Sequence, residues 1–219
     1  VSDREREDAP LYSSLVSSGI STLAPFEGSH EETSRVTTTT LSKFCTDQGI
    51  NHVDFLKVDT EGFDLMVIKG FPWDRMKPRI VLCEFEARKT IPLGYNTETL
   101  TRFLTDQGYS ILISEWHPIA RYGVKHDWNR LVPYPTDFAS PLSWGNLFAY
   151  RDPADGRMIA SLVRQLVKTD PNAVQTPAVK AAATPQKAGG SPTPTKGKRA
   201  PKPPPSPLKV LARRVKQQW

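Results

Sequence analysis

The stretch from Val53 to Gly70 constrains the fold of this chain most strongly. It begins with an apolar run typical of one buried strand and then reaches two carboxylates, Asp59 and Glu61. Gly62 follows and lets the backbone turn, and the apolar residues after it fill about two helical turns before the next glycine. The stretch therefore predicts a strand, a turn and a helix, with two acids at the carboxyl end of the strand.

These two acids have two interpretations. In open α/β sheets, ligands bind in the crevice beyond the carboxyl ends of the strands, which favours a functional site at Asp59 and Glu61. Alternatively, both acids only cap the helix and interact with its positive N-terminal end. The turn by itself does not decide between them.

The same alternation of strand and helix patterns continues through the first 169 residues. It predicts a doubly wound, largely parallel α/β sheet with helices on both faces. Its first main strand would be left as an open hydrophobic edge, so we expect the domain to be N-terminally truncated. Helices are expected at residues 41–48 (with Thr40 as the N-cap), 96–107 and 156–168, further strands at 80–86, 109–113 and 145–150, a short edge strand at 9–15, and an aromatic, polar loop at 115–143.

Composition changes sharply at residue 170. Residues 170–219 hold half of the 20 prolines, with ten Lys or Arg against one acid, whereas the rest of the chain is slightly acidic. The net charge of +6 therefore belongs to the tail, and nucleic-acid binding by the whole chain is not expected. Residues 170–207 read as a Pro/Lys/Ala-rich disordered linker. Residues 208–219 read as a basic amphipathic segment, suited to an anionic membrane or a partner groove, or as a plain solvated tail.

The cysteines, and the lack of a membrane-spanning run or a signal peptide, indicate the cellular compartment. Cys45 and Cys83 have neither metal-site spacing nor the number for a disulfide framework. No apolar run reaches the roughly 18 residues of a membrane span, and the chain does not start with a signal peptide. We expect a cytoplasmic protein, with membrane association only through the tail.

Residues 57–62 read Lys-Val-Asp-Thr-Glu-Gly, which resembles the Lys-Ile-Asp-Val-Glu-Gly signature of FkbM-family methyltransferases. Thr39, Thr40 and Leu41 resemble the Thr-Thr-Leu of that family, although Ser42 replaces its Asp. The resemblance covers roughly residues 1–150 and leaves the tail without a counterpart. It implies a class I methyltransferase (Rossmann-like) sheet, present here from its fourth strand onward.

The resemblance also implies S-adenosylmethionine as the cofactor. Such enzymes hold the methionine part of the cofactor with a Gly-rich turn after the first strand, and this chain has no Gly-x-Gly sequence. The cofactor-binding residues are therefore unknown, and we expect this chain alone to be incomplete and inactive.

Methyl transfer to oxygen requires a hydroxyl that is held in line and loses its proton. Asp59 is our first candidate for the base or hydroxyl-orienting carboxylate, and Glu61 is the second. Glu84 and Glu86 from the next strand are candidate substrate-binding residues. We expect at most one of these two to point toward the site, with the other in a salt bridge to a residue such as Lys57 or Arg88.

Two further hypotheses concern the same crevice. Hard oxygen ligands such as Asp59 and Glu84 suit Mg²⁺, which would orient a sugar diol. Trp116 and His117 are candidate substrate-binding residues, with His117 as an alternative base, or they are only packed at the rim.

We therefore expect part of an O-methyltransferase that acts on a hydroxyl of a saccharide or a hydroxylated secondary metabolite. The alternative is a non-catalytic interaction module whose basic tail recruits a membrane or an acidic partner. An α/β hydrolase is disfavoured, because the chain has no G-x-S-x-G sequence.

Overall fold

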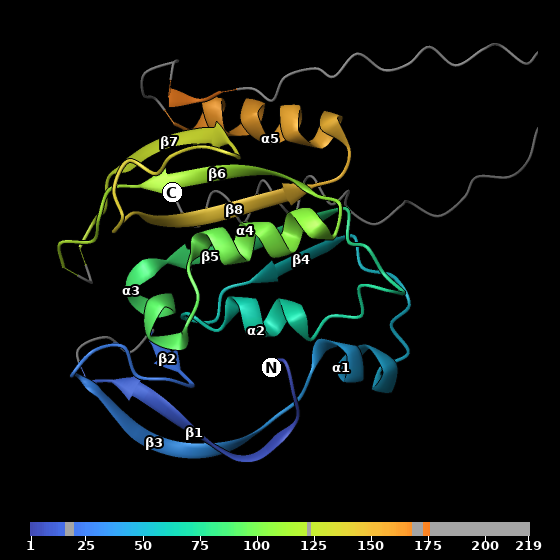
Figure 1. Cartoon of the computed structure of the whole chain (residues 1–219), viewed down its shortest axis with the longest axis vertical. Helices are drawn as coiled ribbons and strands as arrows, with labels where there is room; N and C mark the ends of the chain where they lie inside the picture. Colours follow the sequence, from blue (N-terminus) through green and yellow to red (C-terminus); the bar gives the residue numbers. More distant parts are fainter. Residues whose placement is uncertain (16–19, 122–123, 168–172, 176–219) are drawn as a thin grey trace, which may run out of the picture. The chain divides into compact units, whose positions relative to one another are not determined.

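The computed structural model of the chain describes residues 1–15, 20–121, 124–167 and 173–175, which form two β-sheets with helices beside them (Figure 1). The smaller sheet comes first in the chain. Its strands are antiparallel and lie in the order β2-β1-β3. They are β1 (Arg6–Ser14), β2 (Ser21–Thr22) and β3 (His30–Thr38).

Strand β1 is the central strand of this sheet, so the expectation of an edge strand at residues 9–15 was wrong. β1 begins earlier, at Arg6, and pairs with β2 on one side and β3 on the other. The sequence obscures this sheet because β3 is rich in Glu, Ser and Thr and is mostly exposed. It therefore lacks the alternating apolar pattern of a half-buried strand.

The larger sheet has five strands in the order β4-β5-β8-β6-β7. β4 pairs in parallel with β5, whereas the other three ladders are antiparallel. The expectation of a largely parallel sheet was therefore wrong. The strands are β4 (Phe55–Val58), β5 (Ile80–Glu86), β6 (Ser110–Trp116), β7 (Trp128–Pro133) and β8 (Trp144–Tyr150).

The mixed topology has a physical reason. β4, β5 and β6 run in the same direction, since β8 is antiparallel to both β5 and β6, and helices connect these three strands as parallel strands require. β7 and β8 follow through loops and flank β6 in the opposite direction. Strand β7 lies inside the segment expected to be a loop, and only Leu131 and Val132 of its six residues are buried.

Capping side chains begin three of the helices, one of them through Asp152 Oδ1, which accepts a hydrogen bond from the backbone N–H of Ala154 (2.8 Å). Thr40 Oγ1 accepts a hydrogen bond from the backbone N–H of Lys43 (3.0 Å) at the start of α1, and Asn96 Oδ1 accepts one from Thr99 (3.0 Å) at the start of α4. The predicted N-cap Thr40 is thus confirmed, and α4 begins one residue after the predicted start at Asn96. The helices are α1 (Leu41–Asp47), α2 (Asp64–Lys69), α3 (Ala87–Thr90), the 3₁₀ helix η1 (Ile91–Leu93), α4 (Thr97–Asp106) and α5 (Pro153–Leu166).

Alternate residues of the larger sheet pack against different helices. Val81, Cys83 and Phe85 of β5 share one buried cluster with Leu100 and Leu104 of α4. This face of the sheet, α4 and α2 together form the main hydrophobic core.

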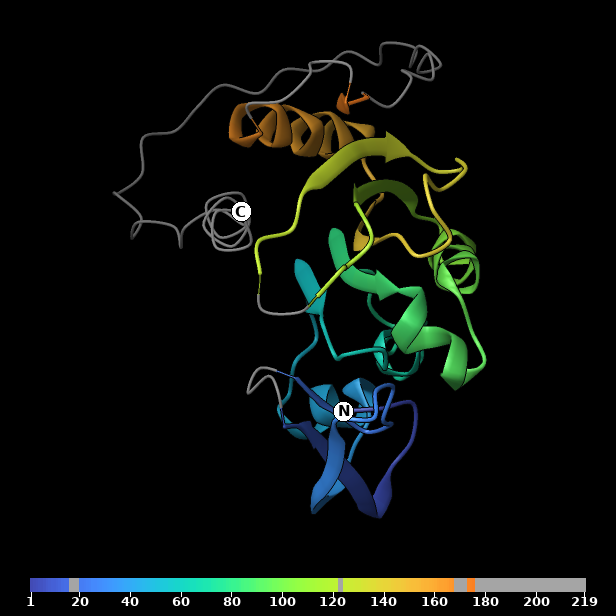
Figure 2. The same ribbon diagram turned by 90° about the vertical axis from the view of Figure 1, so that its left-hand side faces the viewer.

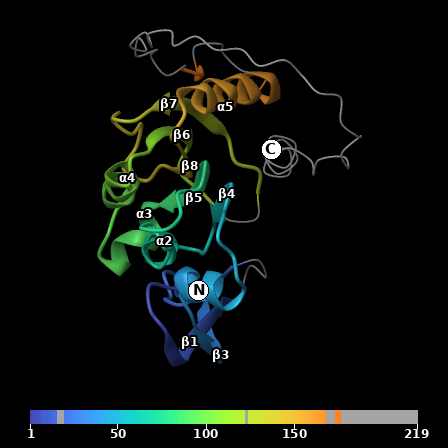
Figure 3. The ribbon, with the colours of Figure 1, turned by 90° about the vertical axis from the view of Figure 1, so that its right-hand side faces the viewer.

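Helix α5 packs on the other face of the sheet. Tyr150 of β8 pairs with Ile80, which alternates with the core-facing residues of β5, and the Tyr150 ring lies against Gly156 of α5. A Cβ at Gly156 would lie 2.5 Å from a ring carbon, so only glycine fits there. Figures 2 and 3 show α4 and α5 on opposite sides of the sheet.

The predicted linker at 170–207 and the basic segment at 208–219 lie outside the described residues, apart from 173–175. Tyr122 of the aromatic loop also lies outside them. The helix predicted at 156–168 is present as α5, but it begins earlier, at Pro153, and ends earlier, at Leu166. Within the described part of the chain, no helix has the length and apolar character needed to cross a membrane.

One buried ion pair ties α5 to the segment before β5. Arg79 donates from Nε and Nη2 to the two carboxylate oxygens of Asp155 at 2.8 and 2.5 Å, and the Asp155 side chain is only 1% exposed. Replacing Arg79 with Met leaves this buried carboxylate without its partner. We expect a loss of about 1–3 kcal/mol in the free energy of unfolding, below the full cost of breaking a buried pair because Arg79 is half exposed.

Urea denaturation measures this loss. Arg102→Met is the matched control, since it removes an exposed ion pair with Glu98 and should change the free energy of unfolding by less than about 0.5 kcal/mol. Equal stability of the two variants would contradict a structural role for the Arg79–Asp155 pair.

Candidate functional site

A cavity of about 470 Å³ lies between the three-stranded sheet and the carboxyl end of β4. Its volume falls within the range of small-molecule sites. One wall comes from β1, β2 and β3, and the other comes from the turn after β4. The lining residues are Val1, Leu11, Ser21, Thr22, Leu23, Val36, Thr37, Thr38, Asp59, Thr60, Glu61 and Phe63.

Asp59 is the first residue after β4 and lies in the cavity wall, where a strand-end acid was expected. Lys57 Nζ donates to its Oδ2 at 2.6 Å. Residues i and i+2 of an extended segment lie on the same side, which brings this ammonium to this carboxylate. The ion pair orients the Asp59 side chain at the cavity.

The turn after Asp59 has an uncommon backbone. Glu61 has φ +52° and Gly62 has φ +94°, both in the left-handed region. Thr22 Oγ1 donates to the Glu61 carbonyl (3.1 Å), and the Tyr95 hydroxyl donates to the Gly62 carbonyl (2.5 Å). The turn is thus held from the three-stranded sheet on one side and from the segment before α4 on the other.

The alternative interpretation of these acids as helix caps was wrong. The N-cap of α2 is Phe63, and no side chain caps this helix end. Asp64, in the first turn, instead accepts hydrogen bonds from the backbone N–H and hydroxyl of Thr60 at 3.4 and 3.3 Å. Asp59 and Glu61 therefore point to other partners.

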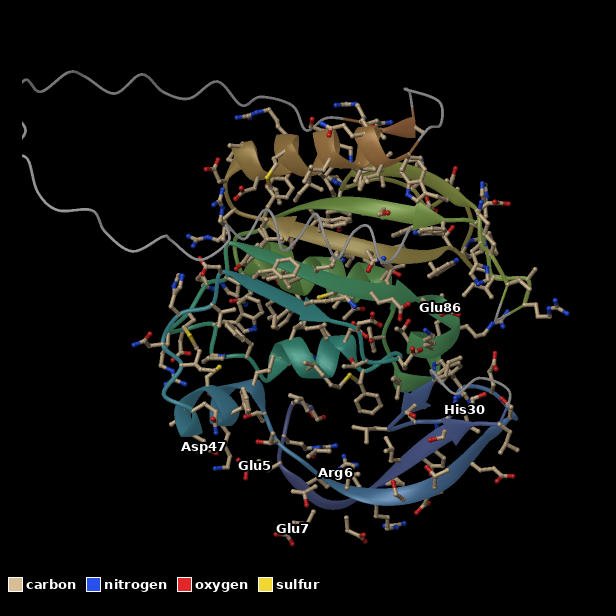
Figure 4. The ribbon with its side chains drawn as sticks, turned by 180° about the vertical axis from the view of Figure 1, so that it is seen from behind. Glu5, Arg6, Glu7, His30, Asp47 and Glu86 are labelled. Atoms are coloured by element: carbon tan, nitrogen blue, oxygen red, sulfur yellow. The ribbon has the colours of Figure 1, made fainter. Side chains whose placement is uncertain are left out.

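Glu61 belongs to a cluster that sequence reasoning missed, which we call the Lys89 cluster: Lys89, Glu61, Glu84 and Glu86. Lys89 Nζ lies 2.6 Å from Glu61, 3.1 Å from Glu84 and 3.0 Å from Glu86, measured to Oε2 in each case. The Lys89 side chain is 4% exposed. Figure 4 shows Glu86 at the end of β5, beside α3.

The cluster corrects two expectations. Glu84 and Glu86 both point to Lys89, because residues two apart in a strand lie on the same face, so the expectation that they point in different directions was wrong. Neither lines the cavity, and their roles in substrate binding stay predictions. Their partner is neither Lys57 nor Arg88, since Lys57 pairs with Asp59 and Arg88 lies 3.5 Å from Glu27. The spacing of three residues between Glu86 and Lys89 was a signal that could have identified the pair.

Burial and negative charge perturb the acids around this turn. Burial raises the pKa of Glu84 to about 8, against the opposing effect of Lys89, and the charges of Asp59, Glu61 and Asp64 add to the increase. Burial, and then the charge of Asp59, raises the pKa of Asp64 to about 6. Burial also opposes the charge on Lys89, but its carboxylate neighbours outweigh that effect and raise its pKa. Burial is therefore the main cause of the raised pKa of Glu84, and the neighbouring acids add to it.

These pKa values predict how stability depends on pH. The folded state binds a proton at Glu84 more tightly than the unfolded state, whose ordinary value is 4.5, so the free energy of unfolding should fall as pH rises from about 4.5 to about 8. Asp64 contributes in the same direction between about 3.8 and 6. Each unit of difference between the folded and unfolded pKa changes the free energy of unfolding by about 1.4 kcal/mol. Glu84→Gln removes this titration and should therefore flatten the part of the pH dependence above pH 6.

Denaturation midpoints at pH 5, 6.5 and 8 (roughly spanning the window of the linkage) test this prediction. Glu32→Gln is the control, because it removes an exposed carboxylate paired with Arg35 and should leave the slope unchanged. A Glu84→Gln variant as pH-dependent as the wild type would contradict the assignment.

The model of the methyltransferase FkbM domain family matches residues 2–111, half of the chain. The match includes β4, its strand-end acid Asp59 and all of the Lys89 cluster. The chain belongs to the FkbM methyltransferase family. No curated protein and no solved structure matches it.

Two further candidate residues, which follow the part of the chain matched by the FkbM methyltransferase model, also lie away from the cavity. Trp116 ends β6, and its ring packs against that of Trp144 with centroids 5.3 Å apart. His117 is exposed, and its backbone carbonyl accepts from Trp144 Nε1 (2.9 Å). Neither residue is among those that line the cavity. Their roles in substrate binding stay predictions.

The arrangement of the acids does not fit Mg²⁺. Asp59 pairs with Lys57 and Glu84 pairs with Lys89, so a lysine ammonium is already the cation beside each expected ligand. Among the described residues, no group of three or more His, Cys, Asp or Glu is placed to hold a metal ion. We therefore derive no step of the reaction through a metal.

Proposed function

We propose that this chain is part of an S-adenosylmethionine-dependent O-methyltransferase whose acceptor is a hydroxyl of a saccharide or a hydroxylated secondary metabolite. The observation that carries the proposal is the place of Asp59. The acid of the family motif lies in the wall of a cavity of small-molecule size, at the carboxyl end of β4. Membership of a methyltransferase family supports S-adenosylmethionine as the methyl donor.

The sheet supports a relation to class I methyltransferases. β4, β5 and β6 run in one direction with helices between them, and their carboxyl ends lie at the edge that carries Asp59. Ligands of such sheets gather at this edge. We propose that this sheet is the part of a Rossmann-like sheet from its fourth strand onward, with β8 as an antiparallel strand inserted between β5 and β6.

The cavity suits an acceptor with several hydroxyl groups. Five of its lining residues carry hydroxyl side chains, which both donate and accept hydrogen bonds. Leu11, Val36 and Phe63 add apolar surface for the carbon skeleton of such an acceptor. The hydroxyl-bearing residues are Ser21, Thr22, Thr37, Thr38 and Thr60.

When bound, S-adenosylmethionine supplies an electrophilic methyl group on a sulfonium sulfur. The acceptor oxygen forms the new O–CH₃ bond, the S–CH₃ bond breaks, and the hydroxyl proton must leave. The Asp59 carboxylate accepts a hydrogen bond from this hydroxyl and then its proton, while Lys57 keeps the carboxylate oriented. Glu61 is the second acid in the wall. The chain has no Gly-x-Gly sequence, so no residue is proposed to hold the methionine part of the donor.

Methyl-labelled S-adenosylmethionine tests the proposal. The native protein is incubated with this donor and a panel of neutral sugars, glycosides and hydroxylated aglycones. Label should appear in an acceptor as a base-stable methyl ether. Label found only as a base-labile methyl ester or on nitrogen would overturn O-methylation, and donor binding without transfer to any hydroxyl acceptor would overturn the acceptor class.

A further inference from the structure

We propose that Lys89 is a positioning residue of this site, whose ammonium holds the Glu61 carboxylate and thereby fixes the Glu61–Gly62 turn in the cavity wall. The effect on catalysis rests on the proposed function, because it assumes that the acceptor binds in this cavity. The structural part of the proposal, that Lys89 fixes the Glu61–Gly62 turn, does not depend on the proposed function.

The contacts of Lys89 make it a link between the sheet and the turn. Glu84 and Glu86 belong to β5, which lies within the five-stranded sheet, and both hold the ammonium from that side. Glu61 belongs to the cavity wall and makes the shortest of the three ion pairs, at 2.6 Å. Lys89 itself does not line the cavity, so it acts on the site through Glu61.

The place of Lys89 is enclosed, which gives its ion pairs strength. Its side chain is 4% exposed, and the ring of Phe26 lies on another side of the ammonium with its centroid 5.8 Å from Nζ. A buried ammonium is costly unless it is paired, and removing it leaves buried carboxylates without their partner. The carboxylate of Glu61 therefore has a strong preference for this one position.

The backbone conformation of the turn requires contacts that stabilise it. Glu61 has φ +52°, a region that residues other than glycine rarely adopt and that persists only where the surroundings enforce it. The adjacent Gly62 packs directly on Lys89: a Cβ there would lie 2.9 Å from Lys89 Cβ. The turn thus contacts Lys89 through both the Glu61 side chain and the Gly62 backbone.

Two variants test the proposal, each compared with the wild type in the native protein. Lys89→Met removes the ammonium, and Glu61→Gln removes one carboxylate charge while Lys89 keeps Glu84 and Glu86. The second variant keeps the test valid if the first fails to fold. Lys89→Arg is the conservative variant, since it retains the positive charge. Arg79→Met is the matched control, because it removes a cation from another buried carboxylate, Asp155.

The first readout is amide hydrogen exchange of residues 60–64, which needs no activity. Lys89→Met and Glu61→Gln should raise exchange in this turn about tenfold or more through local opening, and Lys89→Arg should return part of the protection. Arg79→Met should leave exchange in the turn at the wild-type level. Unchanged exchange in folded Lys89→Met, or in Glu61→Gln when Lys89→Met does not fold, would overturn the proposal.

The second readout is methyl transfer. Lys89→Met and Glu61→Gln should lower kcat/KM for the acceptor by about tenfold to a hundredfold, as expected for a misplaced site group, while KM for S-adenosylmethionine stays unchanged. A loss of equal size in Arg79→Met would indicate general destabilisation and overturn the positioning role. Wild-type protein that transfers no methyl group would overturn the proposed function alone, and hydrogen exchange would still decide the role of Lys89.

Discussion

In the native protein, Asp59→Asn is expected to lower kcat for methyl transfer by about a hundredfold to ten-thousandfold, the range of a lost general base. The amide has nearly the same shape as the carboxylate but cannot take the hydroxyl proton. Its oxygen still accepts the hydrogen bond that Lys57 donates at 2.6 Å in the wild type, so the fold should remain intact. Transfer of labelled methyl groups at saturating acceptor measures the loss, and circular dichroism checks the fold.

Asp54→Asn is the matched control for this variant. Asp54 precedes β4 as Asp59 follows it, and it is exposed and paired with His52 at 3.0 Å. The control makes the same chemical change at the other end of β4, away from the cavity, and should transfer methyl groups at the wild-type rate. Wild-type turnover by Asp59→Asn would remove Asp59 from the mechanism.

Gly62→Ala is expected to lower the free energy of unfolding by about 2–5 kcal/mol. One part is the cost of a side chain at φ +94°, and the other is a collision. The new methyl group would lie 2.9 Å from Lys89 Cβ and 3.1 Å from the Lys89 carbonyl oxygen, and the backbone atom cannot move aside easily. Urea denaturation of the 219-residue chain measures the loss.

Gly108→Ala separates these two parts. Gly108 has φ +88°, and a Cβ built there has no atom within 4 Å, so this variant should lose only the backbone part, about 1–2 kcal/mol. The difference between the two variants is the contribution of the contact with Lys89. Equal losses would mean that Lys89 moves away without cost and that the turn is not packed against it.

Local signals in the sequence were sufficient for the motif and for the type of the elements around it. An apolar run, two acids and Gly62 predicted the strand and the turn, and the cap residue Thr40 predicted the start of α1. The family motif at residues 57–62 directed attention to Asp59, which the structure places in the cavity wall. Each of these features depends on residues within a few positions of one another, which is why the sequence contains them.

The order of the strands within each sheet could not be predicted from these local signals. Periodicity predicts β8 as a strand, but its place between β5 and β6 and its direction depend on pairing between residues such as Phe85 and Gly145, sixty positions apart. The same reason hides the central place of β1 in its own sheet. A hydrophobic pattern with a period of two residues indicates that a segment is extended, but it does not indicate which strands pair with it.

The sequence by itself determined that acids end β4 and β5 beside a glycine turn, because these features are local. Only the tertiary structure decided which charges meet. In the folded chain, Asp59 forms an ion pair with Lys57, and Glu61, Glu84 and Glu86 form ion pairs with Lys89. Trp116 lies outside the cavity wall. The physical reason is that an ion pair requires two side chains within about 4 Å, and the packing of α3 against the turn sets that distance for Lys89.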